Sequence, residues 1–209
     1  MANLDGLDVT PRTSGGVKER WPQIGGADAS TCDPISAFLL DTLRAKSAIH
    51  SRNGMAFITL RCWRKTIKGT QISALKALKL SPPPPLVDAA AKEMADAATK
   101  VFGGAFRCVV PVPAGSSGMT MSLSILLGNR VASLLRIEVI NPIRFDAERG
   151  SSTPRKAGQL KPFQLIASIP PGPILLIDDV ATSGRHLELA HKVLAATGAA
   201  VVSMAWIGS

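Results

Sequence analysis

The chain has 209 residues, of which 46% are apolar and 4% aromatic, and its formal net charge is +9. This length suits one domain with a buried core, and no apolar run reaches the roughly 18 residues of a membrane-spanning helix. The first residues carry acids where a secretory signal would carry bases, so we expect a cytoplasmic protein. Three scattered cysteines and three histidines without metal-ligand spacing argue against a disulfide framework, a zinc ribbon and a histidine-dependent nucleophile.

The N-terminal region is predicted to be an arm followed by one domain. Residues 1–30 are rich in Gly, Ser, Thr, Asp and Pro without a hydrophobic period, so we expect a flexible arm there and a single domain over 31–209. Asp33 before Pro34 is typical of a helix start, with the aspartate as the cap. Apolar spacing predicts that this helix runs to about Ser47 and packs on the core or on a partner.

A strand and two helices are predicted next. Residues 55–63 are rich in β-favouring side chains, and a short helix over 71–80 should end at the four prolines 82–85, which are typical of a stiff spacer. Residues 86–101 have apolar side chains at helical spacing and should form a helix with one face in the core. The glycine pair 103–104 should end that helix.

Positive charge is concentrated between residues 61 and 80. That stretch contains no acid and six bases: Arg61, Arg64, Lys65, Lys68, Lys76 and Lys79. Such a run could serve a nucleic-acid partner, an anionic small substrate or a solvated face. The chain has no Tyr and few other aromatic residues, which argues against a single-strand binding face built on base stacking. We therefore favour a small anionic substrate over nucleic acid.

The second half of the chain repeats one pattern, a buried strand followed by a loop of small residues and a helix. The first copy has its strand at 107–113, its loop at 114–118 and its helix at 123–135. The segment 141–161 then shows no period and carries five bases and two acids. It is long for a simple connection, and loops of this length often act as lids over sites.

The second copy of the pattern, at residues 174–187, is the most specific part of the sequence. Its strand, 174–177, is continuously apolar, as in a parallel sheet that is buried on both faces. Asp178 and Asp179 follow at its carboxyl end, the edge where open α/β sheets bind ligands. The small residues 180–184 then lead into a helix whose start can cradle a phosphate. An ordinary buried strand capped by surface carboxylates is the alternative interpretation.

This stretch resembles the phosphoribosyl pyrophosphate (PRPP) signature of the type I phosphoribosyltransferases, which is an apolar strand, two acids and a loop containing Thr or Ser and Gly. The resemblance implies that Asp178 and Asp179 are the catalytic pair, facing the ribose 2- and 3-hydroxyls and holding Mg²⁺ indirectly, through these hydroxyls or water. It also implies that the 5-phosphate is wrapped by the following loop: Ala181, Thr182, Ser183, Gly184, Arg185 and His186. His186 stands where the family usually has Thr or Ser.

A finer resemblance is to the ComF-like branch of that family, which is associated with DNA uptake and competence. It rests on the sequence VVPVP at 109–113 and on residues 152–160, which are similar to that branch's Thr-Pro-x-x-Ala-Gly-Leu stretch. The branch's N-terminal four-cysteine zinc module is missing from this chain.

The resemblance assigns two further parts of the expected site. The pyrophosphate would lie on the loop after the first strand: Pro113, Ala114, Gly115 and Ser116. The segment 141–161 would be a hood that closes over PRPP, with Arg155 and Lys156 near the pyrophosphate.

We expect an α/β fold, a mostly parallel sheet with helices on both faces, with a small N-terminal appendage of helix and strand. The favoured function is the transfer of phosphoribose from PRPP, with Mg²⁺ as cofactor, to an unidentified acceptor with release of pyrophosphate. Two alternatives stay open: a non-catalytic PRPP- or nucleotide-binding regulator, and a ComF-like competence protein. Nucleic acid is a less favoured partner, a homodimer is left open, and no membrane is expected.

Overall fold

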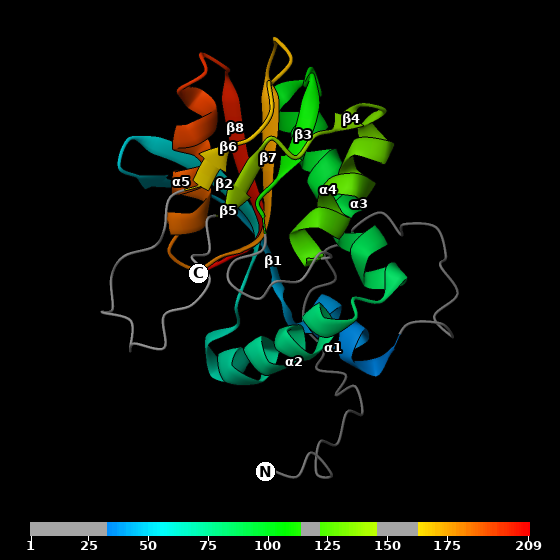
Figure 1. The fold of residues 1–209 in the computed structure, drawn as a ribbon. Helices are drawn as coiled ribbons and strands as arrows, with labels where there is room; N and C mark the ends of the chain where they lie inside the picture. The colour runs from blue at the N-terminus through cyan, green and yellow to red at the C-terminus, as the bar shows by residue number, and fades with distance from the viewer. Residues whose placement is uncertain (1–32, 114–121, 146–162) are drawn as a thin grey trace, which may run out of the picture. The chain divides into compact units, whose positions relative to one another are not determined.

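A six-stranded sheet forms the centre of the fold (Figure 1). The computed structural model describes residues 33–113, 122–145 and 163–209. The strands of this sheet are β1 (Arg44–Arg52), β2 (Met55–Cys62), β3 (Cys108–Pro111), β4 (Glu138–Val139), β7 (Ile174–Ala181) and β8 (Val201–Gly208). Their order is β1-β2-β8-β7-β3-β4, and every neighbouring pair is parallel except β1 with β2. The predicted mostly parallel sheet is confirmed.

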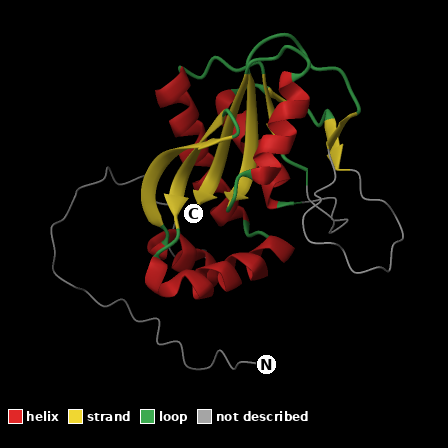
Figure 2. Ribbon diagram, turned by 90° about the vertical axis from the view of Figure 1, so that its left-hand side faces the viewer, coloured by secondary structure: helices red, strands yellow, loops and turns green. Residues whose placement is uncertain are grey.

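Helices cover both faces of the sheet, as predicted (Figure 2). Because successive side chains of a strand point to opposite faces, β7 contributes to two separate cores. Leu175 and Ile177 pack with α3 (Pro84–Phe102) and α4 (Leu123–Leu135), whereas Ile174 and Leu176 pack with α5 (Arg185–Ala195). β7 is therefore buried on both faces, which accounts for its continuous apolar sequence.

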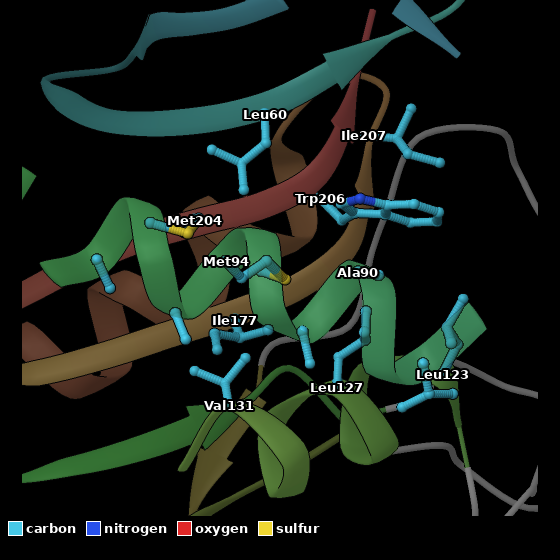
Figure 3. Close-up of a cluster of buried hydrophobic side chains, with 14 of the residues drawn as sticks. Leu60, Ala90, Met94, Leu123, Leu127, Val131, Ile177, Met204, Trp206 and Ile207 are labelled. Atoms are coloured by element: carbon cyan, nitrogen blue, oxygen red, sulfur yellow. The ribbon is translucent and has the colours of Figure 1, made fainter. Parts of the chain in front are cut away.

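The larger core lies between α3, α4 and the sheet (Figure 3). Met94 of α3, Leu127 of α4 and Trp206 of β8 are all fully buried in it. Burial of side chains of this size contributes about 1.5–3 kcal/mol each to folding. The predicted core face of the helix over 86–101 is confirmed, except that Val101 is 58% exposed. Gly103, with φ +70°, ends the helix as predicted.

A layer of short helices lies at the carboxyl end of the sheet (Figures 1 and 2). It consists of α1 (Pro34–Thr42), the 3-10 turn η2 (Lys65–Ile67) and α2 (Lys68–Leu80). The predicted cap of α1 is confirmed, because the Asp33 carboxylate accepts the N–H groups of Ile35 at 2.9 Å and Ser36 at 3.1 Å. The predicted end of this helix near Ser47 is wrong. The chain leaves the helix at Thr42 because residues 44–52 form the ladder of β1 with β2.

A hairpin turn at Asn53 and Gly54 joins β1 to β2. Both residues have positive φ, +47° and +81°, as the tight turn between antiparallel strands requires. Asn-Gly is a strong sequence signal for this turn, so the hairpin could have been predicted. This turn makes β1 antiparallel to β2 at the edge of the sheet.

One other expectation needs correction. Pro84 and Pro85 are not a spacer but the first residues of α3, where the missing proline N–H costs no helical hydrogen bond.

The segment expected to be a loop over 141–161 begins in a strand. β5 (Ile143–Phe145) pairs antiparallel with β6 (Phe163–Leu165) in a separate two-stranded sheet. The rest of that segment, with Arg155 and Lys156, lies outside the described residues, as does the expected arm at 1–30. Among the helices that the structure describes, none is long and apolar enough to cross a membrane.

Candidate functional site

The two acids predicted to form the site lie at the carboxyl end of β7. The strand continues through both residues to Ala181, and each aspartate is only 8% exposed. Asp178 Oδ1 accepts the N–H of Asp179 at 2.8 Å, which fixes the first carboxylate against the backbone. Carboxylates this buried need partners, since a bare charge in such a place would be poorly solvated.

Lys79 of α2 supplies the partner of the second acid. Its Nζ lies 2.7 Å from Asp179 Oδ2, and the side chain of Asp179 is 11% exposed. The helical layer at the carboxyl end of the sheet therefore contributes a side chain that contacts the acid pair directly. Sequence reasoning placed Lys79 in the basic stretch but did not connect it with Asp179, because no local signal links two residues so far apart in the chain.

The environment changes the protonation of Asp178. Burial, reinforced by the negative charge of Asp179, raises the pKa of Asp178 well above its ordinary value. The hydrogen bond from the Asp179 N–H and the charge of Lys79 act in the opposite direction but are weaker. Asp178 therefore takes up a proton more readily than an exposed aspartate does. Its carboxyl group can then donate as well as accept a hydrogen bond.

The loop after the acids is shaped by a glycine. Thr182 and Ser183 are exposed, whereas Gly184 is buried with φ +68°. A Cβ at Gly184 would lie 2.8 Å from the ring of Phe57 in β2, so both the backbone conformation and the space require glycine. α5 begins at the next residue, and its first backbone N–H groups have no partner within the helix. Exposed hydroxyls beside such a helix start are suited to binding a phosphate.

The hairpin of β1 and β2 is hydrogen-bonded to this loop and to α5. Arg52 donates from Nη1 to the carbonyl oxygen of Ser183 at 2.8 Å and from Nε to Glu188 of α5 at 2.6 Å. Asn53 donates to the other oxygen of Glu188 at 2.8 Å, and Lys192 to the same oxygen at 2.7 Å. These hydrogen bonds, from Asn53, Lys192 and Arg52, lower the pKa of Glu188 to about 2. None of these bracing residues was predicted as part of the site.

His186 lies in the first turn of α5, close to β6. Its ring meets that of Phe163 edge to face, with the ring centres 6.5 Å apart. Partial burial lowers the pKa of His186, although the charge of Asp179 acts in the opposite direction. The imidazole therefore takes up a proton less readily than that of an unperturbed histidine.

The first small-residue loop can be described only at its start. Pro113 is half-buried and follows β3, whose neighbour in the sheet is β7, and the N–H of Val112 donates to the carbonyl oxygen of Ile177 at 2.7 Å. The chain thus leaves β3 beside the residue that precedes the acid pair. Ala114, Gly115 and Ser116 lie outside the described residues.

The basic stretch is not one continuous cationic surface. Arg61 is held inside the fold, where its Nε donates to Glu93 of α3 at 2.9 Å and its Nη1 to the carbonyl oxygen of Leu40 at 2.7 Å. Lys79 is paired with Asp179. Two of the six bases therefore serve internal contacts, which weakens the case for a nucleic-acid face.

A resident metal ion does not fit the acid pair alone. Among the described residues, no group of three or more His, Cys, Asp or Glu could hold a metal ion. Magnesium prefers oxygen ligands and keeps several waters, while Asp179 is already paired with Lys79. The two acids suit Mg²⁺ only if a ligand or water supplies most of its coordination.

Solved structures similar to this chain carry the name phosphoribosyltransferase. Adenine phosphoribosyltransferase from Saccharomyces cerevisiae is 16% identical with a TM-score of 0.44, over 84% of this chain and 88% of that one. Orotate phosphoribosyltransferase from Aeropyrum pernix is 15% identical with a TM-score of 0.39, over 83% and 81%. Adenine phosphoribosyltransferase from Leishmania tarentolae is 14% identical with a TM-score of 0.47, over 85% and 88%.

No protein-family model matches the chain, and no curated protein matches it significantly. The names of the similar structures are those of the family that the sequence resembles, while the finer likeness to the ComF-like branch stays a prediction. At identities this low and TM-scores this modest, the likeness carries no argument about activity or substrates. Evidence on activity and substrates therefore comes only from the residues of the candidate site.

Proposed function

We propose that the chain binds PRPP and transfers its phosphoribosyl group to an acceptor, with release of pyrophosphate. One observation carries the proposal: a buried acid pair and a braced glycine loop at a helix start adjoin each other at the carboxyl end of β7. The carboxyl groups can accept hydrogen bonds from two neighbouring hydroxyls, and the N–H groups at the helix start can bind a phosphate. A ribose 5-phosphate has both groups.

The spacing of the two parts fits one sugar phosphate. Two residues of extended strand, about 7 Å, separate Asp179 from Ala181, a span comparable with that from the ribose hydroxyls to the 5-phosphate. Asp178 and Asp179 would receive hydrogen bonds from the 2- and 3-hydroxyls. The N–H groups at the start of α5 and the hydroxyls of Thr182 and Ser183 would donate hydrogen bonds to the phosphate.

In the reaction, the bond between the ribose C1 and the pyrophosphate oxygen breaks, and the electron pair leaves with pyrophosphate. Positive charge develops on the ribose ring, and the nearby carboxylates offset it. A lone pair of the acceptor then forms the new bond at C1, and the acceptor loses a proton to water. Mg²⁺, held by Asp178 and Asp179 only through ribose hydroxyls or water, would neutralise charge on the leaving pyrophosphate.

Binding and turnover test the proposal separately. PRPP with Mg²⁺ should raise the melting temperature, because a ligand of the folded state stabilises it by mass action. The double variant Asp178→Asn, Asp179→Asn should lose this shift, whereas Asp96→Asn on the exposed surface of α3 should keep it. An unchanged melting curve of the parent at millimolar PRPP and Mg²⁺ would contradict any role for PRPP.

A screen of nucleobases and small amines then distinguishes enzyme from regulator. Release of pyrophosphate with one acceptor identifies the substrate. If PRPP binds and no acceptor releases pyrophosphate, the second candidate, a non-catalytic PRPP-binding protein, is favoured; the pairing of Lys79 with Asp179 is compatible with it. A cytoplasmic location and a homodimer remain predictions alongside this proposal.

A further inference from the structure

Lys79 and the glycine loop approach the acid pair from opposite faces of the sheet. Leu75 and Leu78 of α2 pack in the core on the α3 and α4 face, whereas Leu187 of α5 packs in the core on the other face. The ion pair places Asp179 beside α2, because Asp179 Oδ2 lies 2.7 Å from Lys79 Nζ. A sugar lying over the acids would therefore have α5 at one end and Lys79 at the other.

The backbone that carries Lys79 is firmly held. Gln71, in the first turns of α2, is fully buried, accepts the N–H of Arg64 at 2.9 Å and donates to Thr42 of α1 at 3.0 Å. The buried Leu78 anchors the turn beside Lys79. Packing and hydrogen bonds of α2 thus fix the backbone of Lys79 near the acids, and its position does not depend on the ion pair alone.

The ammonium is the accessible half of the ion pair. The side chain of Lys79 is 39% exposed, against 11% for Asp179. A lysine ammonium has three N–H donors, and the contact with Asp179 uses one of them. An anion arriving at the edge of the sheet can therefore bind Lys79 without first separating it from Asp179.

We propose that Lys79 binds the pyrophosphate group of PRPP, an inference that rests on the proposed function. In PRPP the pyrophosphate on C1 and the phosphate on C5 lie at opposite ends of the ribose. If the 5-phosphate lies at the start of α5, the pyrophosphate points to the face from which Lys79 approaches. A compact ammonium charge is suited to phosphate oxygens, and Asp179 holds it in place beside C1.

A structural role predicts something different. If Lys79 only latched α2 to the sheet, its removal would disturb every ligand of the acid pair alike. If it only blocked the acids, its removal would strengthen binding. The proposed role instead separates ligands that carry a pyrophosphate from those that do not.

The test measures dissociation constants by calorimetry for Mg²⁺–PRPP, Mg²⁺–pyrophosphate and ribose 5-phosphate. Lys79→Met should weaken binding of PRPP and of pyrophosphate by about 10-fold to 100-fold, the effect of one charge-assisted hydrogen bond. Binding of ribose 5-phosphate should change far less, because this ligand lacks the group that Lys79 contacts and meets only the altered Asp179. Lys79→Arg should retain much of the pyrophosphate affinity. Lys76→Met, on an exposed position of the same helix, is the matched control.

An equal loss for all three ligands, or tighter binding of any of them, overturns the assignment of Lys79. In either case the parent's own binding of ribose 5-phosphate and PRPP leaves the proposed function standing. A parent that binds none of the three ligands refutes both. If Lys79→Met proves unstable, Lys79→Gln keeps a polar side chain there and should give the same split between ligands.

Discussion

Arg52 donates a hydrogen bond from its Nη1 to the carbonyl oxygen of Ser183 at 2.8 Å, which joins the β1–β2 hairpin to the loop that follows the acid pair. The carbonyl oxygen of this loop residue thus already has a hydrogen-bond partner within the fold. The edge strand β1 is distant from the loop in the sequence, yet it helps to fix the conformation of the loop.

Replacing Arg52 tests this relationship. Arg52→Lys keeps a positive charge near Glu188 but loses the forked geometry that reaches Ser183 as well. We expect the affinity for ribose 5-phosphate to fall by about 2-fold to 10-fold, because the lost hydrogen bond affects the phosphate only through the shape of the loop. Binding of Mg²⁺–pyrophosphate should be unchanged, and a parallel loss for both ligands would mean that Arg52 acts on the whole site rather than on the loop.

Gly184→Ala should destabilise the fold more than an alanine at another glycine with positive φ. The new Cβ would lie 2.8 Å from the Phe57 ring in a backbone conformation that disfavours side chains. We expect a loss of about 2–4 kcal/mol in the free energy of unfolding by urea, from strain and overpacking together. Gly198→Ala is the control, because φ is +85° there but nothing lies within 4 Å of the added Cβ. Equal losses in the two variants would rule out the predicted contact with Phe57.

Glu188 should make stability depend on pH in the acid range. Its pKa is about 2 in the folded protein, against 4.5 as the ordinary value. A lowered pKa stabilises the fold above about pH 4.5, and this contribution disappears as the pH falls toward 2. The melting temperature of Glu188→Gln should therefore lie below that of the parent at pH 6, and the two curves should converge near pH 2. A constant difference between pH 6 and pH 2 would show that Glu188 contributes through packing instead.

His186 should affect phosphate binding only at low pH. Burial lowers its pKa from 6.5, so the ring must gain a proton from a more acidic solution before it can attract a dianion. We expect His186→Thr to bind ribose 5-phosphate as well as the parent at pH 8, and less tightly relative to the parent below about pH 6. The phosphate itself titrates near pH 6, so the ratio of the two dissociation constants is the quantity to measure. A ratio that stays constant with pH would exclude contact between the imidazole and the phosphate.

Local signals predicted well the strand and the helix that flank the acid pair. An apolar run that is buried on both faces, two acids and a small-residue turn lie within one continuous stretch, and β7 and α5 form there as expected. The apolar spacing likewise gave the bounds of α4 correctly. Such elements can be predicted because the residues that define them are neighbours in the sequence.

The edge strand and the partners of the acids could not be predicted in the same way. β1 is mostly exposed and rich in Arg, Lys, Ser and His, so it has no alternating apolar pattern, and its pairing with β2 is what makes it a strand. The contacts of Lys79 with Asp179 and of Arg52 with Ser183 join distant parts of the chain. Only the packing of the whole sheet brings these residues together.

The place of β8 in the sheet has a consequence for how the chain is made. It follows all the other described strands in the sequence, yet Phe57 of β2 and Leu176 of β7 both pair with its Ser203. During synthesis, β2 and β7 leave the ribosome with a gap between them that no earlier segment fills. Pairings this distant in sequence form slowly, and unpaired strand edges promote association with other chains. The nascent protein therefore leaves one edge of β2 and one edge of β7 unpaired until residues 201–208 emerge and close the sheet.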